Sequence, residues 1–375
     1  MATILILGGY GATGRALARH LLRESDVHLV IAGRRLEKSR RFAEALGTEF
    51  GRQRLAAIAA DAADPATLRP ALAGVEVLVV TSPTTHFAEN VARAALETGV
   101  DYLDVQLSAQ KLKVLQSLAS EIARAGRCFI TEAGYHPGLP AAMVRYAASH
   151  LDRLDRALTA GYLSIGRGLA FSEAVDELME VFRRYDARVF RSGQWIPPGR
   201  DYARRVDFRG EIGVRTCYPM FFEELRPLPD LYPSLKELGF YISGTHWFTD
   251  WVITPIAIGA LKLAPRHALR PTGRLVWWAM QAFARPPFQV TLLVEAIGLK
   301  DGQPTRVTAT VSHPDGYEIT AIPVAACLLQ YLDGTARRPG LWMMGHLVDP
   351  LRLFKDMERM GVSTTTIIRP SAGSA

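Results

Sequence analysis

Apolar and polar positions alternate along the first third of the chain in a regular rhythm. Short apolar runs lie at Thr3 to Leu7, Val27 to Ala32, Leu55 to Ala60, Val75 to Val80, Tyr102 to Val105 and Cys128 to Thr131. Segments with helical spacing separate most of them, at Arg15 to Leu22, Leu36 to Leu46, Phe87 to Thr98 and Lys111 to Ala125. This alternation predicts an α/β domain with a doubly wound parallel sheet and helices on both faces.

The pattern changes after the glycine and proline breakers between Ala133 and Pro140. Longer alternating runs follow at Ala157 to Ile165, Val206 to Glu211, Phe288 to Gly298 and Thr305 to Ser312, which favour a second, α+β domain on a mainly antiparallel sheet. Helical patterns return at Thr320 to Leu332 and Pro350 to Met360. We therefore predict a first domain of residues 1–135 plus 317–375 and a second of residues 136–316.

A glycine-rich loop joins the first strand to the first helix. Gly9, Gly11 and Gly14 spell GxGxxG, with Tyr10, Ala12 and Thr13 between them. The glycines permit a tight turn, a close approach of the backbone to a pyrophosphate, and close packing of helix on strand, while the helix N-terminus offers free amides. Because the motif follows a strand and opens a helix, these six residues predict a dinucleotide site in a Rossmann domain.

The end of the second strand indicates which dinucleotide binds. An NAD site would place an acidic residue there, whereas this chain has Arg34 and Arg35, which suit the 2′-phosphate of NADP(H). The alternative is that both arginines begin a solvated helix. Asp61 ends the third strand and is expected to accept from the adenine amino group or to cap the next helix. Ser82 and Pro83 follow the fourth strand and are predicted beside the nicotinamide ribose, with an ordinary loop as the alternative.

Composition narrows the class of protein. The chain has 375 residues, of which 49% are hydrophobic and 22% charged, as expected of a two-domain globular protein. Its net charge of +7 comes from scattered basic residues without a nucleic-acid-binding motif, so no nucleic-acid partner is expected. Three separated cysteines predict neither a zinc site nor a disulfide framework. The start runs directly into a strand pattern, and we expect a cytoplasmic protein.

Four segments of the chain resemble the saccharopine dehydrogenase and reductase family. They are GGYGATGR at Gly8 to Arg15, TGVDYLDV at Thr98 to Val105, AGYHPGLP at Ala133 to Pro140, and GYEITAIPVAACLLQYLDG at Gly316 to Gly334. The resemblance implies a Rossmann domain completed by C-terminal helices and a central domain for substrate binding and homodimerisation. It also implies an NADP-dependent oxidoreductase that acts on an imine or a related unsaturated bond of a small metabolite, or, as in outlying groups, on lipid-like substrates.

Reduction of such a bond needs a proton donor near the hydride acceptor. His136, in the glycine and proline turn after the sixth strand, is our first candidate, with Tyr135 and Asp104 as neighbours that orient it. His86, in the loop after Ser82, is the second candidate. Glu173 could meet an amine substrate, although acids at a helix start usually act as caps.

Residues 247–285 form an apolar segment, and because of it the sequence does not decide between a small-metabolite and a lipid-like substrate. It is rich in Trp, Ile and Leu, but Asp250, Lys262 and Pro255 make it too short to span a bilayer. Basic Lys262, Arg266, Arg270 and Arg274 follow, then Trp277 and Trp278. Two alternatives remain, a helix pair buried at a dimer interface and a peripheral contact with lipid. The corresponding functional alternatives are a membrane-surface reductase of a lipid or polyketide-like substrate and, as a third, a non-catalytic module that senses NADPH.

Overall fold

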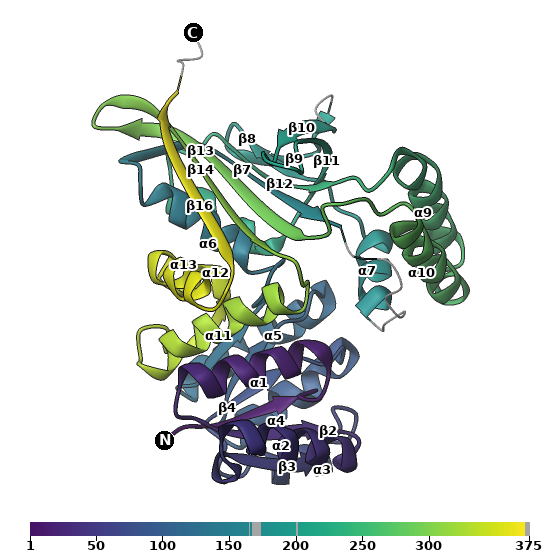
Figure 1. Ribbon diagram of the computed structural model, residues 1–375, viewed down its shortest axis with the longest axis vertical. Helices are drawn as coiled ribbons and strands as arrows, with labels where there is room; N and C mark the ends of the chain where they lie inside the picture. Colours follow the sequence, from purple (N-terminus) through teal and green to yellow (C-terminus); the bar gives the residue numbers. More distant parts are fainter. Residues whose placement is uncertain (165, 167–173, 200–201, 372–375) are drawn as a thin grey trace. The chain divides into compact units, whose positions relative to one another are not determined.

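The computed structural model describes residues 1–164, 166, 174–199 and 202–371 of the chain. The chain divides into two compact units. The first comprises Met1–Leu139 and Tyr317–Met360, and the second comprises Pro140–Gly316 and the residues from Gly361 onward. Figure 1 colours them along the chain, so the first unit combines the purple start with the yellow-green helices near the end.

The first unit is built on a seven-stranded parallel sheet in the order β15-β6-β5-β4-β1-β2-β3. Its strands are β1 (Thr3–Leu7), β2 (His28–Gly33), β3 (Leu55–Ala59), β4 (Val77–Val80), β5 (Asp101–Asp104), β6 (Cys128–Thr131) and β15 (Gly340–Met343). Its main helices are α1 (Ala12–Glu24), α2 (Leu36–Phe50), α3 (Pro65–Ala71), α4 (Ala88–Glu97), α5 (Ala109–Arg124), α11 (Glu318–Leu332), α12 (Met344–Leu347) and α13 (Pro350–Arg359).

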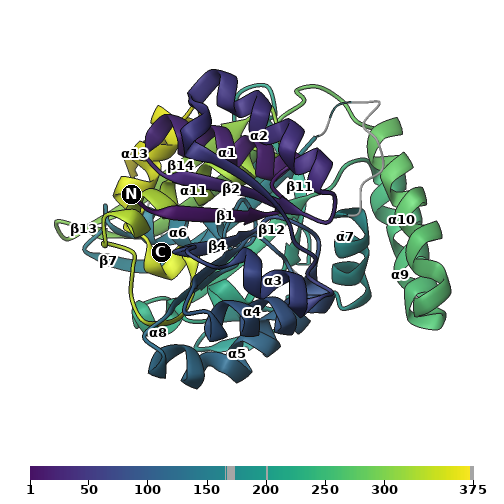
Figure 2. The same cartoon turned by 90° about the horizontal axis from the view of Figure 1, so that it is seen from below.

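Helices cover both faces of this sheet. Figure 2 shows α1 and α2 on one face and α3, α4 and α5 on the other. Strands β4, β5 and β6 are buried along their whole length, which explains why they read as continuous apolar runs in the sequence. The predicted doubly wound Rossmann sheet is therefore confirmed, with strand boundaries that differ from the prediction by two residues or fewer.

The second unit is built on a nine-stranded sheet whose main path is β10-β11-β12-β7-β13-β14-β16. Its strands are β7 (Arg153–Leu163), β8 (Val189–Arg191), β9 (Gln194–Ile196), β10 (Arg204–Asp207), β11 (Val214–Met220), β12 (Glu237–Ser243), β13 (Val290–Lys300), β14 (Gln303–His313) and β16 (Ser363–Pro370). The pair of β7 with β12 is parallel, and the other pairs in the sheet are antiparallel. The predicted, mainly antiparallel α+β unit is thus confirmed.

A helical hairpin interrupts the strands of the second unit. The turns of Thr249–Ile253 lead into α9 (Thr254–Leu263), and α10 (Pro265–Ala282) returns before β13. Helix α7 (Ala174–Arg183) packs against both α9 and α10, and the three lie together in both ribbon views (Figures 1 and 2). The unit also contains α6 (Leu139–Ala148) and α8 (Leu228–Leu231). Within the described residues, no helix is both long enough and apolar enough to cross a bilayer.

The end of the chain departs from the predicted division. We assigned residues 317–375 to the first domain, but β16 pairs antiparallel with β14 along its whole length and so belongs to the second sheet. The run of threonines and isoleucines from Thr364 to Ile368 has high β propensity, and it completes the exposed side of β14. The helices α11 and α13 lie in the first unit.

Candidate cofactor site and active site

The glycine loop has the shape that a pyrophosphate requires. A Cβ on Gly14 would lie 2.5 Å from the carbonyl oxygen of Gly8, and one on Gly9 would lie 2.9 Å from that of Ile6. Only hydrogen fits at these positions, so the loop can turn tightly under the start of α1. Gly11 is the N-cap of that helix and provides no side-chain cap, which leaves the first amides of α1 for phosphate oxygens. These residues fit a dinucleotide.

Tyr10 of the glycine loop lies against the carboxyl end of β2. A Cβ on Gly33 would lie 2.5 Å from the Tyr10 ring, so glycine lets this ring lie flat against the strand end. Arg34 and Arg35 come next and are exposed before the first turn of α2. Two guanidinium groups at this position suit a 2′-phosphate.

A third arginine, which sequence reasoning missed, lies beside this end of the loop. The Nε atom of Arg15 donates to the carbonyl oxygen of Tyr10 at 2.7 Å. Its guanidinium lies 5.0 Å from the centre of the Phe42 ring on α2. These two contacts hold the positive charge of Arg15 between the glycine loop and α2. The signal was present in the sequence, because Arg15 follows the last glycine of the motif directly.

Asp61 has a local structural partner. Its carboxylate accepts from the backbone N–H of Ala63 at 3.0 Å, and its own N–H donates to the Thr67 hydroxyl at 2.9 Å. Asp64 then caps α3 by accepting from the N–H of Ala66. These bonds are those of an aspartate that shapes the turn before a helix. The helix cap that we gave as the alternative role of Asp61 belongs to Asp64.

The loop after β4 lies directly against the glycine loop. Gly8 has φ +90°, and a Cβ there would lie 2.8 Å from Ser82. Gln106, which is buried and was not predicted, donates from Nε2 to the Ser82 carbonyl at 2.6 Å and to the Thr84 hydroxyl at 3.1 Å. Pro83 is exposed in the same loop. Gln106 therefore fixes the loop that we predicted beside the nicotinamide ribose.

A buried ion pair holds Gln106 in turn. The Lys111 ammonium donates to Asp104 Oδ1 at 2.8 Å, to the Gln106 carbonyl at 2.8 Å and to the Thr131 hydroxyl at 2.7 Å. The other Asp104 oxygen accepts from the Thr131 hydroxyl at 2.7 Å, and Oδ1 also accepts from the Gln106 N–H. Lys111 and Asp104 are both fully buried. We call these four residues the strand-edge network, because they join the carboxyl ends of β5 and β6 to α5.

This network changes the role that we predicted for Asp104. Its carboxylate bonds to Lys111, Thr131 and Gln106, rather than orienting the His136 ring. A signal for Lys111 was available, because it stands on the apolar stripe of α5 with Leu115, Leu118 and Ile122. A lysine on a buried helix face needs an acidic partner. The sequence does not show which acid that is.

His136 lies in a turn after β6 that glycines make possible. Gly138 has φ +123°, and a Cβ there would lie 2.7 Å from the Glu132 carbonyl and from the Gly134 N–H. The rings of Tyr135 and His136 pack together with centroids 4.3 Å apart. Because the sheet order is β6-β5-β4-β1, this turn lies at the same edge as the glycine loop and the Ser82 loop.

Burial sets the protonation of this pair. It lowers the pKa of His136 to about 4 and raises that of Tyr135 far above its usual range. At neutral pH the imidazole is therefore neutral and the phenol is protonated. The neutral imidazole of His136 offers one N–H and one lone pair, and the role of His136 as the proton donor stays a prediction.

The remaining predicted residues lie apart from this pair or outside the description. His86 is exposed in the short turn Thr85–Phe87 that leads into α4. Glu173 lies outside the described residues.

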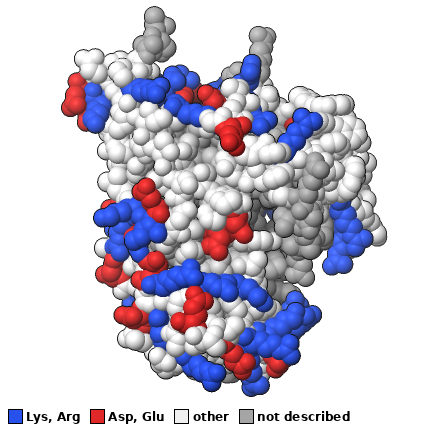
Figure 3. Space-filling model, viewed as in Figure 1, with Lys and Arg blue, Asp and Glu red and all other residues white. Residues whose placement is uncertain are grey.

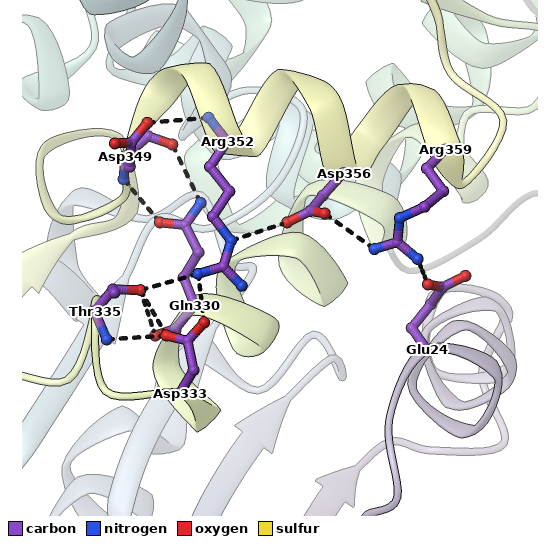
Figure 4. Close-up of polar contacts among 8 residues, drawn as sticks. All are labelled: Glu24, Gln330, Asp333, Thr335, Asp349, Arg352, Asp356 and Arg359. Atoms are coloured by element: carbon purple, nitrogen blue, oxygen red, sulfur yellow. Dashed lines mark hydrogen bonds and ion pairs between the residues drawn. The ribbon is translucent and has the colours of Figure 1, made fainter.

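The C-terminal helices are tied to the glycine-loop helix by polar contacts between side chains. His20 on α1 bonds to Glu318 on α11 at 2.7 Å. Figure 4 shows a second set along α13, in which Arg359 bridges Glu24 and Asp356, and Arg352 bridges Asp356 and Asp333. We call this second set the α13 ion chain. It connects α1, α11 and α13 at the surface of the first unit.

Comparison with known proteins finds a match to a family of NADP-binding domains and a similar fold in a dehydrogenase. Residues 4–129 match the family described as the saccharopine dehydrogenase NADP binding domain. The apo saccharopine dehydrogenase (L-Glu forming) of Saccharomyces cerevisiae has a similar structure, with a TM-score of 0.71 and 17% identity over 98% of this chain and 100% of that one. A spectinabilin polyketide synthase system protein, NorB, of Streptomyces orinoci is 36% identical over 99 residues. That match spans 26% of this chain and 5% of NorB.

Proposed function

We propose that the chain is an NADP-dependent oxidoreductase of the saccharopine dehydrogenase-like family, and that it transfers hydride between NADP(H) and an imine or related unsaturated bond of a small metabolite. The observation that supports this proposal best is the arrangement of three loops at one sheet edge. The glycine loop, the Ser82 loop and the His136 turn follow β1, β4 and β6, which lie close together in the sheet. In open α/β sheets, cofactor and substrate meet at this edge.

The nicotinamide supplies the hydride when the cofactor is bound, and the protein supplies binding and orientation. We assign Gly9 to Gly14 to the pyrophosphate, Arg34 and Arg35 to the 2′-phosphate, and Ser82 with Pro83 to the nicotinamide ribose. We also assign Arg15 to the 2′-phosphate, because its side chain is held beside Tyr10 and α2. Asp61 is better placed to shape its turn than to contact adenine.

We assign His136 a hydrogen bond from its neutral imidazole to the substrate atom that gains the proton. Tyr135 packs on its ring and stays protonated, because burial raises its pKa. His86, being exposed, is the alternative donor. The strand-edge network acts indirectly, because Gln106 bonds to the Ser82 loop and Lys111 bonds to Gln106. It therefore positions the loop rather than taking part in the reaction.

Cofactor titration tests the binding assignment. We expect tighter binding of NADPH than of NADH, and we expect Arg34→Ala and Arg15→Ala each to weaken NADPH binding by roughly tenfold, the scale of one charge-assisted bond to phosphate. NADH binding should stay unchanged. Arg19→Ala is the matched control, because Arg19 also lies over the Phe42 ring, whereas the bond to the Tyr10 carbonyl comes from Arg15. Equal affinities for the two cofactors would contradict the assignment.

A turnover screen tests the reaction. NADPH oxidation, followed by loss of absorbance, should appear with imines or with enoyl compounds. The reverse reaction, in which an amine reduces NADP, should instead appear as a gain of absorbance. His136→Ala should lower turnover roughly 100-fold with cofactor affinity kept, the usual scale for losing one hydrogen bond that stabilises the transition state. Because the pKa of His136 is about 4, the rate should not fall near pH 6.5. Unchanged turnover would move the assignment to His86.

A second candidate substrate has one specific observation in its favour. The hairpin of α9 and α10 exposes large apolar side chains, which would suit a membrane-surface reductase of a lipid or polyketide-like substrate. We include the polyketide class because the name of the protein with the 99-residue match refers to a polyketide synthase system. We also propose that the protein acts in the cytoplasm and that its second unit forms the homodimer, as the family resemblance implies.

A further inference from the structure

The hairpin of α9 and α10 has two apolar faces, and one of them is covered within the second unit. Its inner face contributes Ile253, Ala257, Leu261, Val276 and Ala279 to a buried cluster that also contains Met179 of α7. These positions recur at three and four residues, which places them on one side of each helix. The hairpin is thereby anchored to α7 without using its outer face.

The outer face exposes large side chains. The exposed fractions are 66% for Trp247, 63% for Trp251, 59% for Ile256, 89% for Leu263 and 54% for Trp278. Ile256 and Leu263 are seven residues apart on α9, and Leu275 and Trp278 are three apart on α10, so each pair lies on one side of its helix. Single exposed apolar residues are ordinary, but a group on one hairpin marks a contact surface.

The charges of this segment have one sign. Every charged residue from Trp251 to Val294 is Lys or Arg, and the acids that bound the stretch are Asp250 and Glu295. Lys262 and Arg274 are exposed next to the exposed Leu263 and Leu275, so cations border the apolar face. Figure 3 shows the part of this hairpin on view as mostly uncharged, with basic side chains at its lower end.

Charge distinguishes between the two occupants that the sequence left open. A twofold dimer would place the same patch of both copies face to face, and Lys262, Arg270 and Arg274 would then meet cations of the same kind. An anionic bilayer offers the opposite charge, together with an interface that Trp side chains favour. Apolar and aromatic groups bordered by cations are the composition of a helix that lies in the plane of a membrane.

We infer that the outer face of the α9–α10 hairpin docks on the surface of an anionic lipid bilayer. Trp247, Trp251, Ile256, Leu263 and Trp278 enter the interface, and Lys262, Arg270 and Arg274 face the headgroups. The protein binds the surface and does not span it. This inference concerns membrane binding alone, so it stands or falls separately from the hydride transfer proposed above.

Flotation with vesicles tests the docking, using the full chain without cofactor. Vesicles of phosphatidylcholine with phosphatidylserine should carry the protein upward, and vesicles of phosphatidylcholine alone should carry much less. Leu263→Asp should lower the partition into anionic vesicles roughly tenfold, as expected for one lost apolar anchor. Lys262→Glu with Arg274→Glu should lower it as well, and added salt should weaken the wild-type partition.

The matched control is Leu231→Asp, because Leu231 is 52% exposed in the same unit but lies on α8, outside the hairpin. It should float like the wild type. Wild-type protein that stays at the bottom with anionic vesicles would overturn the inference, as would equal losses for Leu231→Asp and Leu263→Asp. Light scattering gives the remaining outcome, since a dimer that Leu263→Asp converts to monomer would identify a second copy as the occupant. NADPH titration of each variant shows whether the cofactor site is intact.

Discussion

Two polar networks stabilise the first unit, and they differ in their contact with water. In the strand-edge network, Lys111 and Asp104 have no exposed side-chain surface, and every proton of the ammonium has an acceptor. In the α13 ion chain of Figure 4, Arg352 and Asp333 are 38% and 42% exposed. Both networks join elements that are distant in the sequence. The number of ion pairs is therefore a poor measure of how much they contribute to the stability of the unit.

The physical reason is the cost of leaving a charge alone. When one partner of a buried ion pair is removed, no water can take its place. The other partner then stays in the core as an uncompensated charge. An exposed arginine that loses its partner is solvated again, and the exchange is nearly neutral. The residues of the strand-edge network are therefore held more rigidly than those of the α13 ion chain. A loop next to a cofactor requires such rigid support.

The largest effect is expected for removal of the buried cation. Lys111→Ala should lower the free energy of unfolding by about 3–5 kcal/mol, because Asp104 then stays buried without a counter-ion. Urea unfolding followed by circular dichroism measures this change. Lys113→Ala, an exposed lysine on the same helix, is the control and should change stability by less than about 0.5 kcal/mol. Equal effects for the two variants would remove the contrast between the networks.

A double variant sharpens the contrast. Lys111→Met combined with Asp104→Leu removes both charges, so the loss should be smaller than the sum of the two single losses by about 1–3 kcal/mol. The same unfolding experiment measures this coupling. Cofactor affinity is the second measurement, because in the double variant Gln106 loses its bonds to Lys111 and Asp104, which hold it against the Ser82 loop. Additive losses would mean that the two charges do not interact.

The pH dependence of stability extends the comparison to a further titratable group, His136. Burial lowers the pKa of His136 from 6.5 to about 4, so between these values the unfolded chain binds a proton that the folded protein does not. The contribution of His136 is complete above pH 6.5 and is lost as the pH falls toward 4. We expect a loss of about 1–2 kcal/mol, reduced from the full value because the side chain is partly exposed. His136→Gln should flatten this slope, and an unchanged slope would assign it to other groups.

The smallest effect is expected at the surface. Arg359→Ala breaks the contacts to Glu24 and Asp356, yet it should cost only about 0.2–1 kcal/mol. The loss should shrink further in high salt, which screens exposed pairs and leaves the buried pair almost unchanged. Unfolding curves at two salt concentrations measure both. A loss as large as that of Lys111→Ala would show that the α13 ion chain fixes the C-terminal helices cooperatively.

The sequence predicted the first sheet well because parallel strands buried on both faces leave an unmistakable apolar run. It also placed the glycine loop and Arg34, since the motif works through its spacing along the chain. It missed β15 and β16, because Gly340–Met343 is short and Ser363–Pro370 begins with four polar residues and is mostly exposed. Both are edge strands, and their location depends on partners far away in the sequence.

The site residues were harder to predict for the same reason. Gln106 and Lys111 act through contacts that cross from β5 to β6 and to the Ser82 loop, and no spacing in the sequence encodes such contacts. The pKa of His136 depends on burial, which a sequence pattern does not give. What could be predicted was the sheet edge at which these groups gather, not the bonds among them.

The late return of β16 to the second sheet has a consequence for synthesis on the ribosome. The first unit needs β15 and α13, and the second needs β16, which is the last described strand of the chain. Neither unit can therefore reach its final form before these late elements have been synthesised, although most of the second unit emerges much earlier. Until Ser363–Pro370 leaves the exit tunnel, β14 presents an open edge. Nascent chains would then be most vulnerable to mispairing, and a pause in translation near this point would prolong the exposure.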